Sequence, residues 1–200
     1  MRTGNGKTGR PISFDRDAAL EAAMLLFWKR GYEGTSMADL TQAMGLNPSS
    51  IYAAFGDKHA LFSVAVSRYM KTRAQYAVKA LEEPTLERVI RALFDNTVAF
   101  LTTPGHPPTC MTLAGAMGCG VDGAPARDLM TEIRNQNQVA IRKRLIKARK
   151  SGELSKDVNV DDYTRYLSTI ISGLSIQAAN GSTKAELKRT AQMALRHLGY

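Results

Sequence analysis

The amino-acid sequence predicts an all-α protein in which a small N-terminal helical unit precedes a larger helical bundle. Apolar residues recur at helical spacing in about nine segments, capping residues and glycines separate these segments, and no credible strand pattern is present. The 200 residues are 44% hydrophobic, which is enough to build a buried core. No apolar run reaches the roughly 18 to 20 residues that span a bilayer, and no hydrophobic segment follows the N-terminus as in a secretory signal. We therefore expect a cytoplasmic protein without a membrane-spanning segment.

Residues 1–14 are rich in glycine, threonine and arginine, and we expect them to form a flexible basic arm. The arm carries Arg2, Lys7 and Arg10, and no acidic residue precedes Asp15. The whole chain has a net charge of +9, which favours a polyanionic partner. Much of this excess lies in residues 142–150, however, so charge alone does not identify the partner.

Residues 15–30 predict the first helix. Acidic residues occupy its first turn, Lys29 and Arg30 occupy its last turn, and a glycine follows. Phe27 and Trp28 belong to its apolar stripe, so we interpret both as core residues rather than ligand contacts.

Residues 35–61 predict two short helices joined by a tight turn. Ser36 and Asp39 have the spacing of a capping box at the start of the first helix, which Gly45 ends. Asn47 caps the second helix and Pro48 takes its first position, where the missing N–H costs nothing. The apolar residues of the pair that face one small core are Leu40, Met44, Leu46, Ile51 and Phe55. This pattern matches a helix-turn-helix, whose second helix lies in the major groove of DNA.

The rest of the chain predicts a bundle of longer helices. We expect helices over residues 58–81, 85–101, 124–150, 161–179 and 183–198. A proline-containing loop at 102–108 and a short apolar segment at 109–118 separate the second of these from the third.

The run TSMADLTQAMGLNPSSIYAAFGDKHALF resembles the DNA-binding domain of the TetR family of transcriptional regulators. The resemblance extends from Gly9 to about Tyr69 and includes GRP before the first helix and FWKRGYEGTS at its end. It implies a basic arm over 1–14, a helix-turn-helix domain over 15–57, and an effector-binding and dimerisation domain over 58–200. It also implies a homodimeric repressor that a small-molecule effector or a thiol-reactive signal releases from a palindromic operator in double-stranded DNA. An activator of the same fold is the alternative.

The resemblance and the helix pattern together predict the DNA contacts. We expect Tyr52 to contact the DNA backbone, and we expect Lys58, with Thr35 or Ser36, to bind phosphates. Asn47, Ser49 and Ser50 would meet base edges. The second helix contains no arginine, lysine or glutamine, so strong bidentate guanine readout is absent there. Specificity would then depend on the serine and asparagine contacts, on thymine methyls near Pro48 and Ala53, on DNA shape, and on Arg10 in the arm.

The last two helices resemble the pair that dimerises TetR-type regulators across a two-fold axis. The residues that we expect at the dimer interface are Ile171, Leu174, Ala178, Leu187, Ala194 and Leu198. Packing within one chain would explain the same residues nearly as well. The dimer prediction also rests on the need to reach two DNA half-sites one helical turn apart.

The middle of the second domain is where this family holds its effector, and the candidate lining is apolar and rich in methionine. The predicted lining residues are Phe94, Val98, Leu101, Cys110, Met111, Leu113, Met117, Met130, Ile133, Asn137, Tyr163 and Tyr166. Ordinary core packing is the alternative for each single residue. We expect a neutral or anionic hydrophobic effector.

The two cysteines, Cys110 and Cys119, predict neither a disulfide framework nor a metal site. On one helix they would face opposite sides. The segment PTCMTLA resembles a cysteine-bearing segment of relatives that sense reactive species, although an inert buried thiol is the alternative. A couple of Cys110 with His106 is the one candidate nucleophile for a cysteine-dependent enzyme, and it lacks an orienting third group. We therefore predict no catalysis, no cofactor and no metal.

Overall fold

The computed structural model describes residues 14–200, which form ten α-helices and no strand. The all-α prediction is confirmed. The predicted arm contacts, Arg10 among them, lie outside the described residues. The helices are α1 (Arg16–Arg30), α2 (Met37–Met44), α3 (Pro48–Phe55), α4 (Lys58–Thr72), α5 (Gln75–Leu81), α6 (Leu86–Leu101), α7 (Met111–Ala114), α8 (Ala124–Lys150), α9 (Val160–Ala179) and α10 (Lys184–His197).

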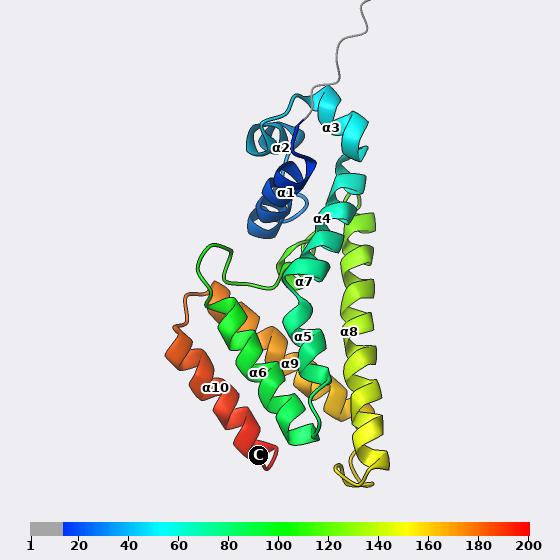
Figure 1. The fold of residues 1–200 in the computed structure, drawn as a ribbon, viewed down its shortest axis with the longest axis vertical. Helices are drawn as coiled ribbons and strands as arrows, with labels where there is room; N and C mark the ends of the chain where they lie inside the picture. The colour runs from blue at the N-terminus through cyan, green and yellow to red at the C-terminus, as the bar shows by residue number, and fades with distance from the viewer. Residues whose placement is uncertain (1–13) are drawn as a thin grey trace, which may run out of the picture.

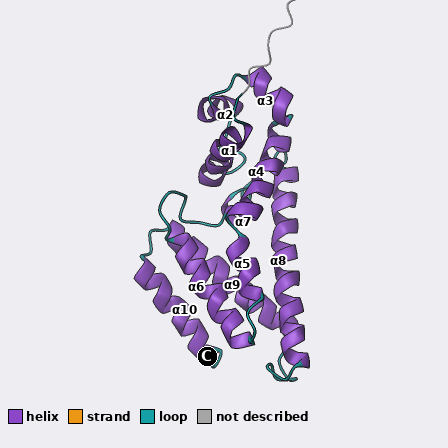
Figure 2. Ribbon diagram, in the orientation of Figure 1, coloured by secondary structure: helices purple, strands orange, loops and turns teal. Residues whose placement is uncertain are grey.

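The molecule is elongated, with α1, α2 and α3 at one end and α3 nearest its tip (Figure 1). Helix α4 leads from this end into the body, and α8 runs along most of the length of the molecule. Helices α5, α6, α9 and α10 form the bundle at the other end, and Figure 2 shows that loops alone connect the helices. Among the described residues, no helix is both long enough and apolar enough to cross a membrane.

Two large hydrophobic cores divide the fold, and a small third cluster joins α5 to α6. The first lies among α1–α4 and includes Phe27 and Phe62, whose rings meet edge to face with 5.1 Å between their centroids. It also takes in Met111 and Met130 from α7 and α8, so the DNA-binding end packs directly on the second half of the chain. The second core lies among α6, α8, α9 and α10. The proposed domain boundary after residue 57 stays a prediction, since the buried residues of α4 belong to the first core.

The single helix predicted over residues 58–81 is wrong. The backbone N–H groups of Arg73 and Ala74 both turn back to the carbonyl of Tyr69, and the Gln75 side chain donates to the Met70 carbonyl. These bonds break the regular ladder between α4 and α5. Tertiary packing explains the break, because α4 packs along α1 whereas α5 packs along α6.

The start of the helix expected over residues 161–179 also needs correction. Helix α9 is capped by Asn159, whose side chain accepts the N–H groups of Asp161 and Asp162, so Asp161 lies inside the helix. Cys110 and Cys119 do not share a helix, because α7 ends at Ala114 in a glycine-rich stretch.

Candidate nucleic-acid interface and effector cavity

The helix-turn-helix is built by local capping. The Ser36 hydroxyl accepts the N–H of Asp39, and the Asp39 carboxylate accepts the N–H of Ser36, which confirms the predicted capping box. Gly45 ends α2 with φ 64° and ψ 28°, a left-handed conformation that favours glycine. The Asn47 side chain caps α3, and Pro48 takes the first position of that helix.

Asp39 also pairs with Arg30 of α1 at 2.7 Å, which ties α2 to α1. Hydrogen bonds from the Ser36 side chain and backbone, followed by the hydrogen bond from Arg30, lower the pKa of the partly exposed Asp39 carboxyl to about 2. The start of α2 is therefore held by an ionised carboxylate over a wide pH range.

The outer face of α3 carries small polar residues and one aromatic ring. Pro48, Ser49 and Ala53 are exposed, and Tyr52 is 52% exposed, whereas Ser50 is half-buried. The side-chain Oδ1 of Asn47 accepts the Ser49 hydroxyl and the Ser50 N–H, both at 2.8 Å. The asparagine therefore keeps its amide N–H₂ for another partner while its oxygen is already used.

Thr35 does not have the exposed side chain that phosphate binding needs. Its residue exposure is 0%, and its hydroxyl donates to the Gly31 carbonyl at 2.7 Å. This hydrogen bond closes the turn that leads from α1 into α2. Ser36, by contrast, is exposed, although its hydroxyl also donates to Asp39.

Lys58 begins α4 but its side chain turns toward the interior. Its ammonium lies 4.3 Å from the centroid of the Tyr32 ring, a cation–π contact. Burial is the main cause that lowers the pKa of Lys58, and it is opposed by the Cys119 thiolate, which forms only at the alkaline pH where Lys58 titrates, and by Glu33. Phosphate binding by Lys58 would require the side chain to leave this ring.

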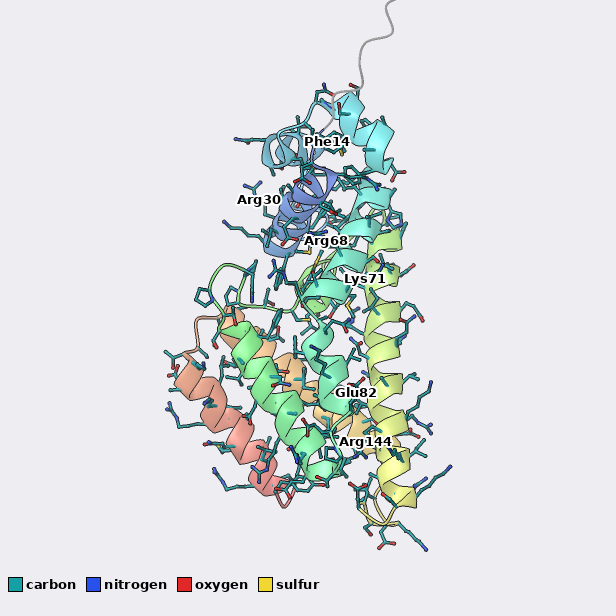
Figure 3. All side chains as sticks on the ribbon, viewed as in Figure 1. Phe14, Arg30, Arg68, Lys71, Glu82 and Arg144 are labelled. Carbon is teal, nitrogen blue, oxygen red and sulfur yellow. The ribbon has the colours of Figure 1, made fainter. Side chains whose placement is uncertain are left out.

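An ion-pair network fixes α4 against α1. The Glu21 carboxylate accepts from Arg68 at 2.7 Å and from Arg73 at 2.6 Å, and Arg68 also pairs with Asp17. Partial burial raises the pKa of Glu21, but the hydrogen bonds from the two arginines outweigh this effect and lower it overall. Arg68 lies on α4 near α1, where Figure 3 labels it. The angle between α1 and α4 is therefore constrained by charge as well as by packing.

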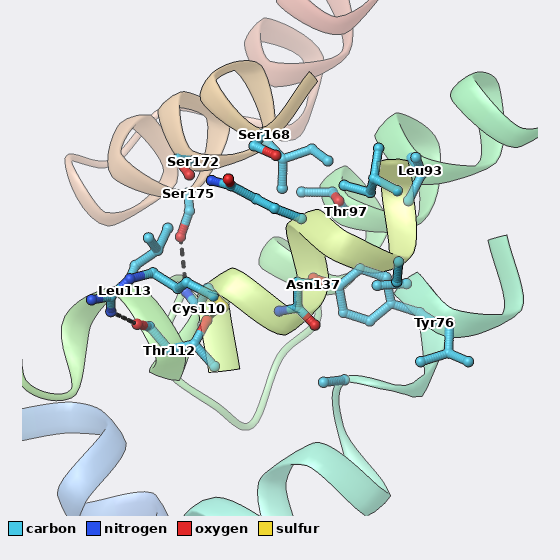
Figure 4. Close-up of a pocket in the computed structure, with 18 of the residues that line it drawn as sticks. Tyr76, Leu93, Thr97, Cys110, Thr112, Leu113, Asn137, Ser168, Ser172 and Ser175 are labelled. Atoms are coloured by element: carbon cyan, nitrogen blue, oxygen red, sulfur yellow. Dashed lines mark hydrogen bonds between the residues drawn. The ribbon is translucent and has the colours of Figure 1, made fainter. Parts of the chain in front are cut away.

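A cavity of about 160 Å³ lies in the second half of the molecule, between α4, α5, α6, α8 and α9 (Figure 4). One wall is aliphatic and aromatic, and another carries serine and threonine hydroxyls. The lining comprises Tyr69, Met70, Ala74, Tyr76, Ala77, Val78, Leu81, Leu93, Thr97, Leu101, Cys110, Thr112, Leu113, Arg134, Asn137, Gln138, Ala140, Ile141, Ser168, Ile171, Ser172 and Ser175. An apolar cavity with a few convergent polar groups is the usual form of a small-molecule site.

Four of the predicted lining residues are found in the cavity wall: Leu101, Cys110, Leu113 and Asn137. The other eight lie elsewhere. Phe94, Val98, Tyr163 and Tyr166 contribute to the second core, Met111, Met130 and Ile133 contribute to the first core, and Met117 is 63% exposed. The reason is the helical rotation, because Leu93, Thr97 and Leu101 of α6 face the cavity while the next residues turn about 100° away.

Cys110 lies where the cavity meets the loop before α7. Its backbone N–H donates to the Ser175 hydroxyl at 2.8 Å, as the dashed line in Figure 4 shows. Its sulfur lies 3.0 Å from the Thr112 hydroxyl and 3.5 Å from the Tyr69 hydroxyl. Burial is the main cause that raises the pKa of Tyr69, so this phenol stays protonated beside the sulfur.

The predicted dimer residues lie largely inside the protomer. Leu174, Ala178, Leu187 and Ala194 are buried in the second core, and Ile171 lines the cavity. Leu198 packs partly buried against the same core. Buried side chains of this kind stabilise one chain and cannot provide the surface for a second, so these four buried residues need correction as interface residues. Ile171 and Leu198 are partly exposed and stay predictions. The large apolar residues that α9 and α10 do expose are Ile176, at 53%, and Met193, at 64%.

The sequence reading missed the polar wall of the cavity. Ser168, Ser172 and Ser175 follow one another at i, i+4 and i+7 along α9, and Arg134, Asn137 and Ile141 do so at i, i+3 and i+7 along α8. Both spacings indicate a single helix face. On α9, this face brings three serine hydroxyls to the cavity wall.

Comparisons with known proteins agree with this arrangement. Residues 19–65 match the family model described as bacterial regulatory proteins of the tetR family, and residues 85–194 match the model of the tetracyclin repressor-like C-terminal domain. The HTH-type transcriptional repressor ComR of Escherichia coli K12 is 30% identical over 94% of this chain and 90% of its own length. The repressor BdcR of the same strain is 31% identical over 93% of this chain and 90% of its own.

Among solved structures, a cysteine mutant of the TetR family transcriptional regulator CifR, complexed with 26-bp double-strand operator DNA, superimposes with a TM-score of 0.90. It is 34% identical, and the alignment covers 94% of this chain and 98% of that one. The helix-turn-helix at one end, the helical bundle behind it and these matches over both parts lead to one conclusion. The chain belongs to the TetR family of bacterial regulatory proteins.

Proposed function

We propose that this protein is a homodimeric transcriptional repressor that binds a palindromic DNA operator through α3 and is released when its cavity is occupied or its cavity thiol reacts. The observation that carries this proposal is the outward face of α3 at the tip of the molecule. That face presents Ser49, Tyr52 and Ala53, and the helix contains no acidic residue. The relatives ComR and BdcR, which are named as repressors, favour repression over activation.

The DNA-binding step is tested by selecting bound fragments from sheared host DNA near physiological salt and sequencing them. A palindromic motif with half-sites about one helical turn apart is expected from a two-fold dimer. Tyr52→Phe should weaken binding to all sequences, whereas Ser49→Ala should change the sequence preference. A uniform loss of affinity for Ser49→Ala would show that this residue does not meet a base edge.

The role of Lys58 is tested separately, because its ammonium rests on Tyr32. If Lys58 moves onto a phosphate, Lys58→Ala should lower the slope of log affinity against log salt by roughly 1. An unchanged slope would mean that Lys58 acts only in packing the start of α4.

A dimer surface on α9 and α10 is supported by the exposure of Ile176 and Met193. Gly173 lies on α9 between the buried Leu174 and this surface. A Cβ added to Gly173 would meet nothing within 4 Å, so this chain does not fill the space beside it. Ile176→Lys and Met193→Lys should each shift the protein toward monomers in sedimentation velocity. Val139→Lys, a change at a similarly exposed apolar residue on α8, is the matched control and should leave the oligomeric state unchanged.

The coupling from cavity to DNA can follow α4 directly. Tyr69 and Met70 of α4 line the cavity, and the first residue of the same helix lies two residues after Gly56, which ends α3. A ligand that favours another position of Tyr69 would change the tilt of α4 and the spacing of the two α3 helices. Tight ligand binding without any change of DNA affinity would contradict this two-state mechanism.

The thiol-reactive alternative rests on Cys110, which lines the cavity. Treatment with N-ethylmaleimide should release DNA from the wild type and from Cys119→Ser, but not from Cys110→Ser. Release from Cys110→Ser as well would assign the sensitivity to Cys119 and remove the thiol signal from the cavity.

A further inference from the structure

Arg134 supplies the cavity with its one formally charged lining side chain. The remaining lining residues are apolar or carry neutral hydroxyl, thiol or amide groups, and none is a carboxylate. A half-buried cation beside apolar surface is costly unless another group compensates its charge. The partners of Arg134 therefore indicate what the cavity can accept.

The guanidinium of Arg134 is held in place by neutral groups. Its Nη1 donates to the Thr112 carbonyl at 2.5 Å, and its Nη2 donates to the Thr131 hydroxyl at 2.8 Å. A guanidinium has five N–H donors in a planar fork, so these two bonds orient the group and leave the other donors for a ligand. Within residues 14–200, Arg134 forms no salt bridge with an acidic side chain.

Two other arginines of α8 differ in this respect. Arg142 pairs with Asp161, and Arg144, which is buried near the far end of the helix (Figure 3), lies 3.7 Å from Glu153. Both have a carboxylate of this chain as their partner. Arg134 faces a cavity instead, with its charge uncompensated.

The dimensions of the cavity limit the ligand to a small molecule. A volume of about 160 Å³ is close to that of an engineered apolar cavity that holds benzene, which was on the order of 150 Å³. Arg134, Asn137 and Ile141 succeed one another along a single face of α8, and Leu101 and Ile171 complete the apolar end. A ligand lying along α8 would place a polar head at Arg134 and an apolar body toward Ile141.

We propose that the cavity binds a small hydrophobic monocarboxylate, whose carboxylate pairs with Arg134 and whose ring or short chain fills the space beside Ile141. The pairing would provide charge-assisted hydrogen bonds to donors that the protein leaves open. The inference rests on the proposed function in one respect, which is that the cavity is the effector site.

The test compares three probes of one shape by isothermal titration calorimetry on the full-length protein: 3-phenylpropanoate, 3-phenylpropanamide and 3-phenylpropylamine. We expect the acid to bind at least about tenfold more tightly than the neutral amide, as one charge-assisted hydrogen bond would give, and the amine to bind weakest. Equal binding of acid and amine, or no binding of the acid, would overturn the proposal.

Variants then assign the preference to Arg134. Arg134→Gln keeps a donor for the Thr112 carbonyl but removes the charge, so it should abolish the preference for acid over amide. Arg134→Lys keeps the positive charge and should keep part of the preference for acid over amide. Its behaviour therefore shows whether loss of the preference in the glutamine variant comes from the lost charge or from misfolding. Arg149→Gln, an exposed change in the last turn of the same helix, should behave as the wild type. A full preference in Arg134→Gln would contradict the assignment.

DNA binding is measured in parallel with a fragment from the selection experiment. Binding of 3-phenylpropanoate without release of DNA would leave the carboxylate site standing and overturn the proposed control by effector. Normal DNA binding together with failure of the acid to bind would overturn the ligand class and leave the DNA-binding function standing.

Discussion

The indole Nε1 of Trp28 donates a hydrogen bond of 2.9 Å to the carbonyl oxygen of Thr109, which lies 81 residues away in the sequence. The next residue, Cys110, lines the cavity and donates its own N–H to Ser175 of α9. One short stretch of backbone therefore joins α1 of the DNA-binding end to the wall of the cavity. This stretch offers a second connection between the two ends, in addition to α4.

Replacing Trp28 with phenylalanine should weaken this connection. Trp28→Phe keeps an aromatic ring in the first core but removes the donor to Thr109, and a partly buried carbonyl without its partner costs about 1–3 kcal/mol. The free energy of unfolding from urea denaturation followed by circular dichroism should fall by at least that amount, because the smaller ring also leaves space unfilled in the core. Tyr52→Phe, at an exposed residue, should stay within about 0.5 kcal/mol of the wild type. Equal stability of all three proteins would show that the hydrogen bond contributes nothing net.

The carboxylate of Asp39 should make stability depend on pH in the acid range. Its pKa is lowered from 3.8 to about 2 in the folded protein, so its contribution is fully present above the unfolded value and is lost as the pH falls through the folded value. The difference in melting temperature between wild type and Asp39→Ala should be constant above about pH 5 and should shrink toward pH 2. In Ser36→Ala, the pKa of Asp39 measured by NMR should rise toward its ordinary value. A difference that grows as the pH falls would have the wrong sign for this mechanism.

The turn of the helix-turn-helix depends on the backbone of Gly45. Its φ of 64° lies in the left-handed region, and a Cβ added there would meet nothing within 4 Å. Gly45→Ala should therefore cost only the backbone penalty of about 1–2 kcal/mol, measured by chemical denaturation. Gly45→Asn should cost less, because asparagine tolerates this conformation better. An equal loss in both variants would indicate a steric cause that the structure does not show.

The negative charge of Glu33 should suppress the reactivity of Cys119. Glu33 accepts the Gly120 N–H at 2.6 Å, and the pKa of Cys119 is raised first by burial and then by the charge of Glu33. Glu33→Gln keeps an acceptor for Gly120 but removes the charge, so a larger thiolate fraction should react. In a Cys110→Ser background, the rate of modification by 5,5′-dithiobis(2-nitrobenzoate) at pH 8 should increase. An unchanged rate would mean that access to the thiol, rather than its ionisation, controls the reaction.

Much of the DNA-binding end could be predicted because its signals are local. The capping box of Ser36 and Asp39, the left-handed Gly45 and the Asn47 cap each involve residues within three positions of one another. A capping side chain acts on its own helix, so its effect is visible in a short stretch of sequence. The burial of Thr35 could not be predicted from a short stretch of sequence, because a threonine that precedes an N-cap residue can equally well be exposed.

The bundle was predicted less well, because its faces are chosen by distant partners. Residues 58–81 carry no proline or strong breaker, yet α4 and α5 separate because they pack on α1 and α6 respectively. Similarly, Leu174 and Ala178 suit a dimer surface or a core equally well, and the packing of α9 against α6, α8 and α10 places them in the core.

The sequence by itself determined the all-helical class, the ends of most helices and the helix-turn-helix, because helical periodicity and capping are properties of neighbouring residues. Only the tertiary structure decided which side chains surround the cavity. Arg134, Tyr76 and Ser172 are far apart in the chain, and they meet because hydrophobic packing fixes the rotation of α8, α5 and α9 about their axes. A helix of mixed polarity has several faces that could be buried, and the choice among them depends on the surface against which it packs.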